Sequence, residues 1–387
     1  MRGFSLSSGL AYIVPPELES PSKGIMPVRE FVKNDVPQVV NLYWKFMSPR
    51  TGEAPPALHD SFTDLYFRNP MLDACAPSFV YEISGEVLGF FGVTTRRMCV
   101  SGEVIRVGFA GNFVIHPKAR HGAAAPGLLG AFVASNHELL LTDSANDISR
   151  RLFQRVGFTT IPASNLHWAR PLQPGKYAVY AMSRSMSSKT SAAFRFFAKP
   201  LLALLDSTSL KIFSSGRVPK TALLAEDLSL ETLLYSFAEY HKKYTLWPQY
   251  DAESLRWLLE FMGRNKKRGT LRGFGLRDES RQIVGWYLYY ARPGAIGEAV
   301  QVWGKPHLYK AVLEHLFQDA REQGVIALHG LAEYRRIADL SDQGCFFTCR
   351  GGWTLAHSRR AELLDILQRG DAFLSRLDGE WCLNPGV

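Results

Sequence analysis

The sequence of 387 residues has no apolar run that approaches the roughly 20 consecutive residues needed to cross a bilayer. Residues 1–25 also lack the continuous apolar core of a signal peptide, and they are rich in Ser, Pro and Gly. We therefore expect a flexible leader over residues 1–25 and a cytoplasmic location for the protein.

Cysteine is scarce as well, with five residues in the whole chain. An odd number of cysteines without two short-spaced pairs argues against a complete disulfide framework. Cys345 and Cys349 lie close together, but small buried side chains explain this pair better than metal ligands do. We therefore predict a reduced protein without a metal site.

The excess of Lys and Arg (45) over Asp and Glu (36) gives a formal net charge of +9. A positive surface attracts phosphate groups in general, so coenzyme A, nucleic acid and anionic lipid are all eligible partners. Recognition of a transfer RNA would need a long basic surface, whereas the basic residues here are dispersed apart from Lys266-Lys267-Arg268. The length leaves room for two domains of ordinary size.

The most informative stretch of the sequence is GNFVIHPKARHGAAAPGLL, residues 111–129. An extended apolar run ends at Pro117, a basic loop of small residues follows, and a helix begins with Pro126 near its first position. Small residues let the backbone approach a ligand, and a helix N-terminus offers N–H groups and a positive dipole end. Since Arg120 and His121 would add charge or donors, the loop suits a phosphate or pyrophosphate.

This stretch resembles the coenzyme A loop of the GCN5-related N-acetyltransferases, in which Arg/Gln-x-x-Gly-x-Gly/Ala follows a strand that ends in Val-x-Pro. The matching residues are Ile115-His116-Pro117 and Arg120-x-x-Ala123-x-Ala125. An Ala-rich helix start with an incidental Arg is the alternative explanation of the loop alone. A second motif follows in the family's order, because residues 146–158 look like its next helix and end at Gly157-Phe158.

The resemblance implies an acetyl-CoA or other acyl-CoA donor and a set of residues that hold it. The strand end would pair through its backbone with the pantetheine arm at Phe113, Val114 and Ile115. The loop would hold the pyrophosphate with Arg120, His121, Gly122, Ala123 and Ala125. The next helix would touch the coenzyme with Asn146 and Ser149.

Two groups that the family often uses in catalysis are missing. Its relatives often carry a carboxylate about six positions before the end of the Val-x-Pro strand, where this chain has Phe109, Ala110 and Gly111. The Tyr that commonly serves as acid is replaced by Phe153. The remaining candidates for proton transfer are Glu82, His116, Asp143 and, from the second half, Asp371 or Asp378, although a surface carboxylate or a capped turn explains each one too.

The second half of the chain repeats the pattern of the first. Val87–Phe90 matches Ile283–Trp286 at an offset of 196 residues (283 − 87). Gly157–Phe158 matches Gly344–Cys345 at 187 (344 − 157), so nine residues are lost between the two points. The loss falls on the phosphate loop, because residues 302–308 pass from strand to helix without the Arg-x-x-Gly-x-Ala pattern.

We therefore predict an α/β protein of two tandem acyl-CoA N-acyltransferase folds, each a mixed, mostly antiparallel sheet flanked by helices. The predicted parts are residues 26–183 with the coenzyme loop, a connector 184–220, and residues 221–387 without the loop. The predicted strands are 28–32, 79–83, 87–93, 104–115, 138–142, 222–224, 271–277, 283–290 and 298–303. The predicted helices are 35–46, 60–68, 126–135, 146–156, 230–244 and 251–262.

The connector carries a basic, Phe-rich apolar stretch at 192–205. Packing against one of the domains is the simpler explanation, and peripheral contact with an anionic membrane surface is the alternative.

The tandem arrangement resembles mycothiol synthase and the peptidoglycan-bridge aminoacyltransferases. It implies transfer of an acetyl or other acyl group from acyl-coenzyme A to an amine acceptor: a small metabolite, an amino sugar or a cell-envelope precursor. The alternatives are a transferase that uses aminoacyl-tRNA and a non-catalytic regulator that binds coenzyme A. The oligomeric state does not follow from the sequence.

Overall fold

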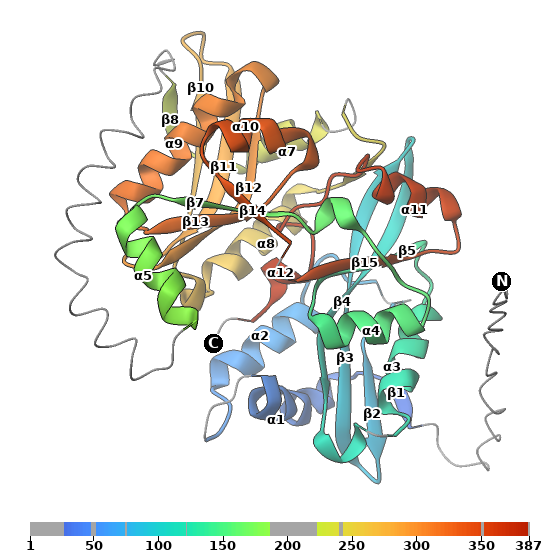
Figure 1. Cartoon of the computed structure of the whole chain (residues 1–387). Helices are drawn as coiled ribbons and strands as arrows, with labels where there is room; N and C mark the ends of the chain where they lie inside the picture. Colours follow the sequence, from blue (N-terminus) through green and yellow to red (C-terminus); the bar gives the residue numbers. More distant parts are fainter. Residues whose placement is uncertain are drawn as a thin grey trace, which may run out of the picture.

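Two mixed sheets flanked by helices lie side by side in the computed structural model (Figure 1). The structure describes residues 27–47, 52–73, 76–120, 122–185, 223–239, 243–349 and 352–385. The predicted fold class is confirmed, since each sheet is antiparallel except for one central parallel pair. The leader, the membrane-contact stretch 192–205 and His121 lie outside the described residues.

The first sheet has the strand order β1-β2-β3-β4-β5-β15-β6, and β9 pairs with one end of β3. Its parallel pair is β4 with β5. The strands are β1 (Val28–Glu30), β2 (Phe79–Ile83), β3 (Glu86–Val100), β4 (Glu103–Ile115), β5 (Leu139–Ala145), β6 (Thr159–Thr160), β9 (Leu246–Pro248) and β15 (Trp353–His357).

The second sheet has the order β14-β7-β13-β12-β11-β10-β8, with β12 and β13 as its parallel pair. The strands are β7 (His167–Pro171), β8 (Leu224–Asp227), β10 (Thr270–Arg277), β11 (Ile283–Ala291), β12 (Ile296–Gly304), β13 (Ala327–Leu331) and β14 (Phe346–Thr348).

The two halves of the chain exchange strands. β7 comes from the first half and lies between β14 and β13 of the second sheet, whereas β15 comes from the second half and lies between β5 and β6 of the first. Figure 1 shows the green β7 among orange strands and the red β15 beside cyan ones. The division into 26–183 and 221–387 stays a prediction, and neither half supplies its whole sheet.

Helices cover both faces of each sheet. The α-helices are α1 (Val36–Met47), α2 (Pro56–Phe67), α3 (Ala124–Val133), α4 (Asp147–Arg155), α5 (Pro174–Ser185), α7 (Leu230–Ala238), α8 (Ala252–Gly263), α9 (Tyr309–Glu322), α10 (Ile337–Asp342), α11 (Ala361–Gln368) and α12 (Glu380–Leu383). The 3-10 turns are η1 (Lys33–Asp35), η2 (Pro117–Ala119), η3 (Pro162–Ser164), η5 (Lys266–Arg268), η6 (Pro306–Leu308) and η7 (Tyr334–Arg336).

Most predicted elements lie within a few residues of the observed ones. The turn between β2 and β3 explains one accurate boundary, because Ser84 and Gly85 have φ of 51° and 81°, as a tight right-twisted hairpin requires. The second helix begins earlier than predicted, at Pro56, since Pro is favoured in the first helical turn. The helix predicted over 230–244 ends at Ala238.

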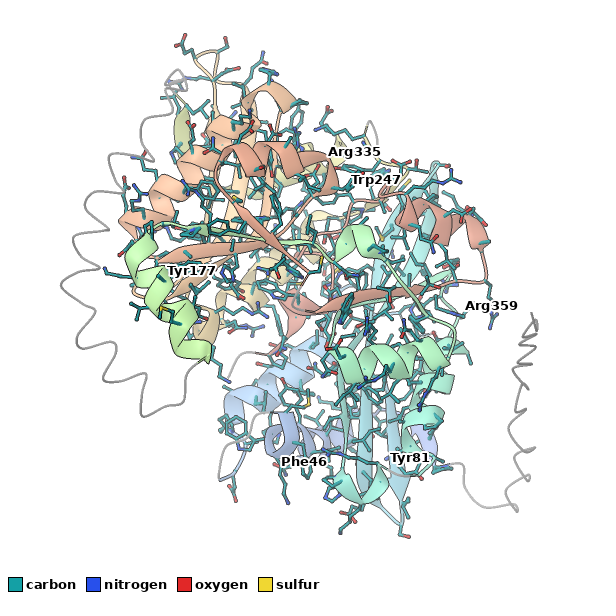
Figure 2. All side chains as sticks on the ribbon, viewed as in Figure 1. Phe46, Tyr81, Tyr177, Trp247, Arg335 and Arg359 are labelled. Atoms are coloured by element: carbon teal, nitrogen blue, oxygen red, sulfur yellow. The ribbon has the colours of Figure 1, made fainter. Side chains whose placement is uncertain are left out.

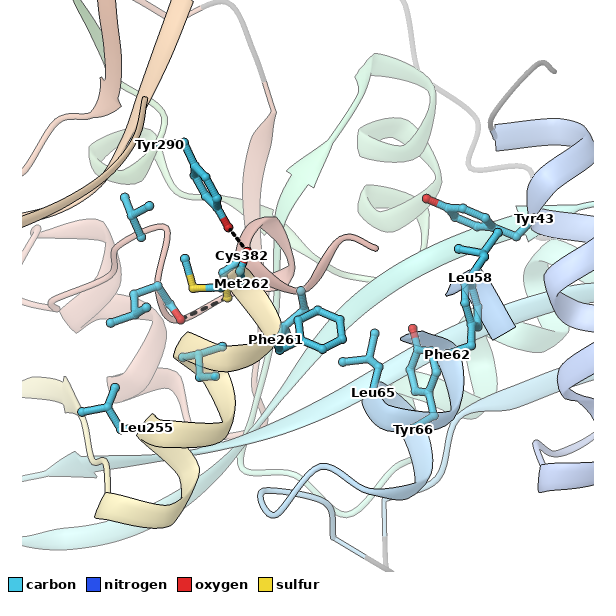
Figure 3. Packing of buried hydrophobic residues seen from close by; sticks show 14 of the residues in the cluster. Tyr43, Leu58, Phe62, Leu65, Tyr66, Leu255, Phe261, Met262, Tyr290 and Cys382 are labelled. Atoms are coloured by element: carbon cyan, nitrogen blue, oxygen red, sulfur yellow. Dashed lines mark hydrogen bonds between the residues drawn. The ribbon is translucent and has the colours of Figure 1, made fainter. Parts of the chain in front are cut away.

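One hydrophobic core joins the two sheets. α1 and α2 cover a face of the first sheet, α7 and α8 cover a face of the second, and these two layers pack on each other. Figure 3 shows Phe261 of α8 beside Leu65 of α2, both of them buried. A second core beneath α3 and α4 covers the opposite face of the first sheet, and α9 and α10 cover the opposite face of the second.

Candidate functional site

The parallel strands of the first sheet separate after a short ladder. β4 pairs with β5 only at Val107–Phe109 and Leu139–Leu141, and no ladder joins them beyond that point in the described chain. We call the gap between Ala110–Ile115 and Thr142–Ala145 the first splay. The loop predicted to bind phosphate follows β4 directly, so it lies beyond the open end of this splay.

A bulge in β4 marks the first splay. Asn112 has a φ of 50°, and the register against β3 shifts between Phe90 and Gly92. The Asn112 amide donates to the hydroxyl of Tyr66 on α2 at 2.9 Å, which holds the unusual conformation. Gly92 leaves the room for this ring, because a Cβ there would lie 2.0 Å from the Tyr66 hydroxyl.

Glu380 of α12 bridges the two strands of the splay. Its Oε1 accepts a hydrogen bond from the backbone N–H of Asn112 on β4 at 3.0 Å, and its Oε2 accepts one from the hydroxyl of Ser144 on β5. Gly111 permits this approach, since a Cβ there would lie 3.3 Å from Cγ of Glu380. The carboxylate that β4 lacks is therefore supplied to the same region by the C-terminal segment.

Asp143 lies beside Glu380 and forms an acidic pair with it. Its Oδ2 accepts from the backbone N–H of Trp381 at 3.4 Å, while its buried Oδ1 has no hydrogen-bond partner among the described residues. Gly379 allows the close contact, because a Cβ there would lie 1.9 Å from Oδ2. Both acidic side chains keep partial exposure, and Ser144 is exposed.

Burial weakens both acids, and the charge of Asp143 weakens Glu380 further. Burial raises the pKa of Asp143 to about 6. The pKa of Glu380 is raised to about 7, first by burial and then by the negative charge of Asp143, against the hydrogen bonds from Ser144 and Asn112. Glu380 can therefore gain or lose a proton near neutral pH, as a general base must.

The predicted loop forms the start of α3. α3 begins at Ala124, and the first N–H groups of a helix have no carbonyl one turn earlier to bind. Gly122 and Ala123 are exposed, and Ala125 is partly exposed. The exposed Arg120 donates through Nε to the carbonyl of Ile115 at 3.4 Å. These groups could hold a pyrophosphate at the end of the splay.

The other predicted coenzyme contacts lie along the same two strands. Phe113 and Ile115 pack toward α3, and Val114 lies in the core beneath α1 and α2. Asn146 follows β5 and caps α4, where its side-chain oxygen accepts from the N–H groups of Ile148 and Ser149 at 3.0 and 2.9 Å. The structure thus places these residues at the strand ends that border the splay.

The predicted catalytic residues are not gathered together. Glu82 binds Arg29 through the guanidinium Nε at 2.8 Å, and the ring of His116 accepts from the N–H of Lys118 at 3.1 Å. No hydrogen bond or ion pair joins either side chain to Asp143 in the described parts of the chain. Of these three candidates, Asp143 alone borders the first splay.

The candidates from the second half also have structural partners. Asp378 is buried and accepts from the hydroxyl of Tyr250 at 2.6 Å, whereas Asp371 forms an ion pair with Arg335 at 2.8 Å. Phe153, which replaces the Tyr expected from the resemblance, lies in the core beneath α3. Sequence analysis missed Glu380 because no spacing motif surrounds it.

The second sheet has a corresponding gap, which is filled. β12 and β13 pair at Ile296–Glu298 and Ala327–His329, and we call the gap beyond these residues the second splay. Arg376 bridges it by donating from Nη1 to the carbonyls of Ala299 and His329, both at 3.2 Å. With Phe373 and its neighbours in place, the remaining cavity measures about 30 Å³.

A larger cavity lies between the two halves. This central pocket has a volume of about 490 Å³, and its wall includes Tyr43 of α1, Glu298 of β12 and Trp381 of α12. Trp381 is the residue after Glu380, and the charge of Glu380 acts on Tyr43 in the pocket wall, so the pocket lies near the acidic pair although neither acid lines it. Small-molecule sites commonly have volumes of about 300–1,000 Å³.

Other types of site have less support in the described residues. They contain no group of three or more His, Cys, Asp or Glu side chains that could hold a metal ion. No described helix combines the length and apolar character required to span a bilayer. Cys345 is buried and Cys349 exposed, and both are free thiols.

Two solved structures share this fold. A protein of unknown function from Enterococcus faecalis, described as a probable N-acyltransferase, matches with a TM-score of 0.57 at 10% identity over 86% of this chain and 72% of that one. A GCN5-related N-acetyltransferase from Anabaena variabilis matches with a TM-score of 0.55 at 11% identity over the same shares. No protein-family model and no curated protein matches the sequence. At this identity, these likenesses establish the fold alone.

Proposed function

We propose that this protein transfers an acetyl or other acyl group from acyl-coenzyme A to an amine acceptor, with Glu380 as the general base. The observation that carries the proposal is the position of Glu380, whose carboxyl group bridges Asn112 and Ser144 across the first splay. The loop at Arg120 to Ala125, beyond the open end of the splay, supports an acyl-coenzyme A donor.

The acidic pair suits the proton transfer that amide formation requires. The acceptor nitrogen forms a C–N bond with the thioester carbonyl carbon, the C–S bond breaks, and nitrogen gives up a proton. Ionised Glu380 accepts that proton and can pass it to the departing sulfur or to solvent. Burial and then the negative charge of Asp143 raise the proton affinity of Glu380, so the base becomes stronger while its pKa stays near neutral pH.

The chain's own groups could also hold the donor. A backbone N–H in the bulge at Asn112 points into the splay, where Glu380 now accepts its hydrogen bond. Backbone N–H groups in such positions stabilise the oxyanion of acyl transfer. The helix start after Arg120 offers N–H groups and positive charge to phosphates.

The test is Glu380→Gln, which keeps the shape of the side chain and removes the base. We expect thioester consumption with acetyl-CoA and a panel of amines to fall by about 10²- to 10⁴-fold, the usual contribution of a general base. Binding of acetyl-CoA, followed by calorimetry, should remain. Glu362→Gln, on the exposed side of α11, is a matched control that should keep wild-type turnover.

Two results would contradict the proposal. Wild-type turnover in Glu380→Gln would remove Glu380 from the chemistry. Acetyl-CoA binding without consumption by any amine would favour the non-catalytic regulator instead. The likeness to mycothiol synthase and the nature of the amine, whether metabolite, amino sugar or envelope precursor, stay predictions.

A further inference from the structure

The central pocket is lined unevenly by charge. Among the described residues, its wall holds three basic side chains, Lys267, Arg268 and Arg292, and one carboxylate, that of Glu298. Glu298 is already paired, because Nη1 of Arg268 lies 3.1 Å from its Oε2. A ligand of this pocket therefore meets a positive field.

Arg268 is held in a fixed position. It donates to the carbonyl of Trp381 at 2.8 Å, and its guanidinium lies 3.5 Å from the centre of the Trp381 ring. The guanidinium of Arg376 also contacts this ring, at 4.6 Å. Contacts inside the protein therefore hold the Trp381 ring and the Arg268 guanidinium in place before any ligand binds.

Arg292 differs from Arg268 in having its charge available. It is exposed on the turn that leads into β12, and no carboxylate lies within ion-pair distance of it among the described residues. A guanidinium in this position can form two parallel hydrogen bonds with a phosphate or a carboxylate.

The pocket also reaches toward the acidic pair. Tyr43 lines it, and the Tyr43 hydroxyl donates to the side chain of Asn384 at 3.2 Å. Burial raises the pKa of Tyr43 to about 12, and the charges of Glu380 and Arg268 act on it with opposite signs. The Tyr43 hydroxyl is therefore close enough to both Glu380 and Arg268 to feel their charges.

We propose that the central pocket binds the acceptor, and that the acceptor is an amine which also carries an acidic group held by Arg292 and Arg268. The acidic group is a phosphate or a carboxylate, since a guanidinium recognises both through the same pair of oxygens. This inference rests on the proposed function, because Glu380 must receive the proton of the bound amine. A volume of about 490 Å³ accommodates a molecule of the size of an amino sugar phosphate.

The experiment uses two matched pairs of probes on the full chain without acyl-coenzyme A. Glucosamine 6-phosphate is compared with glucosamine, and γ-aminobutyrate with n-butylamine, by titration calorimetry at low salt. The acidic member of at least one pair should bind about tenfold or more tightly than its neutral partner, as charge-assisted hydrogen bonds provide. The pair that responds distinguishes phosphate from carboxylate.

A variant and its control locate the effect. Arg292→Gln should weaken binding of the acidic probe by about tenfold and leave binding of the neutral probe unchanged. Arg359→Gln removes the same charge at a distant exposed site and should change neither. Figure 2 shows Arg359 at the edge of the molecule opposite to Tyr177, which lies on α5 together with the pocket residue Tyr180.

Absence of acidic preference in both pairs, or wild-type binding in Arg292→Gln, would overturn the inference. The titration contains no donor, so its outcome is separate from that of the Glu380→Gln test. If the acidic probes bind no more tightly than the neutral ones but turnover still depends on Glu380, the acceptor has no acidic group and the proposed acyl transfer stands. If the acidic probes bind more tightly but turnover does not depend on Glu380, the pocket binds anions and the proposed reaction is wrong.

Discussion

The two splays are bridged by side chains of one C-terminal segment, residues 373–383, but the bridging groups carry opposite charge. Glu380 accepts an N–H of β4 in the first splay, and Arg376 donates to carbonyls of β12 and β13 in the second. The first splay leads to a loop of small residues, whereas the second retains a cavity of about 30 Å³, enough for about one water molecule. The same strand geometry thus serves as a candidate site in one sheet and as part of the core in the other.

The largest expected difference between the splays concerns coenzyme binding. Ala125→Glu places bulk and negative charge at the start of α3, so it should abolish acyl-coenzyme A binding altogether. His307→Glu makes the equivalent change in the second sheet, at the exposed turn before α9, and should leave binding intact. Titration calorimetry should give about one coenzyme per chain for the wild type, since Pro306 removes an N–H from the tight second turn.

A binding site that survives in Ala125→Glu would show that the donor domain is assigned to the wrong sheet. A stoichiometry near two in the wild type would show that the second splay opens for a ligand.

Stability should depend on Arg376 more than on Glu380. Arg376→Met leaves the carbonyls of Ala299 and His329 without their donor, so we expect the free energy of unfolding to fall by roughly 2–4 kcal/mol. Chemical denaturation measures this change, and the exposed Arg359→Met is the control. A loss equal to that of the control would show that Arg376 does not hold the second splay together.

Replacement of Arg120 should have a smaller effect on coenzyme binding at the first splay. Charge-assisted hydrogen bonds contribute roughly 1.5–3 kcal/mol, so Arg120→Ala should weaken acyl-coenzyme A binding about tenfold to a hundredfold. Its melting temperature should change little, because the side chain is exposed. Unchanged affinity would exclude Arg120 from the coenzyme site.

The smallest effect is a pH dependence of stability at the acidic pair. Burial and the charge of Asp143 raise the pKa of Glu380 from its ordinary value to about 7. The contribution of Glu380 to stability is therefore fully present at low pH and is lost as the pH rises through about 7. Glu380→Gln should therefore lose less stability than the wild type between about pH 5 and pH 8, measured by denaturation at each pH. Parallel curves would show that Glu380 does not titrate in this range.

The sequence predicted the fold through local signals. Hairpin turns and helix starts depend on short stretches of sequence, so the strands around Ser84-Gly85 and the helix after Pro117 lie close to their predicted positions. Glu380 carries no such signal, because its partner Ser144 lies 236 residues earlier in the chain. The pairing depends on where α12 packs, which hydrophobic periodicity cannot specify.

The exchanged strands were missed for the same reason. A strand's pattern shows which face is buried, but it does not identify its neighbours in the sheet. β15 could pair with any open edge, and the structure places it between β5 and β6, about two hundred positions earlier in the chain. The repeated pattern predicts that each half is complete in itself, and so it does not indicate the exchange.

The exchange has a consequence for synthesis on the ribosome. Domains commonly fold as they emerge, N-terminal first. Here the first sheet cannot close between β5 and β6 until Trp353–His357 has been made, so both strands keep open edges while about half of the chain is translated. Such edges pair readily with other chains. A nascent chain stalled before residue 353 lacks the long-range contacts that complete the first sheet. It should therefore be prone to aggregation and to capture by chaperones.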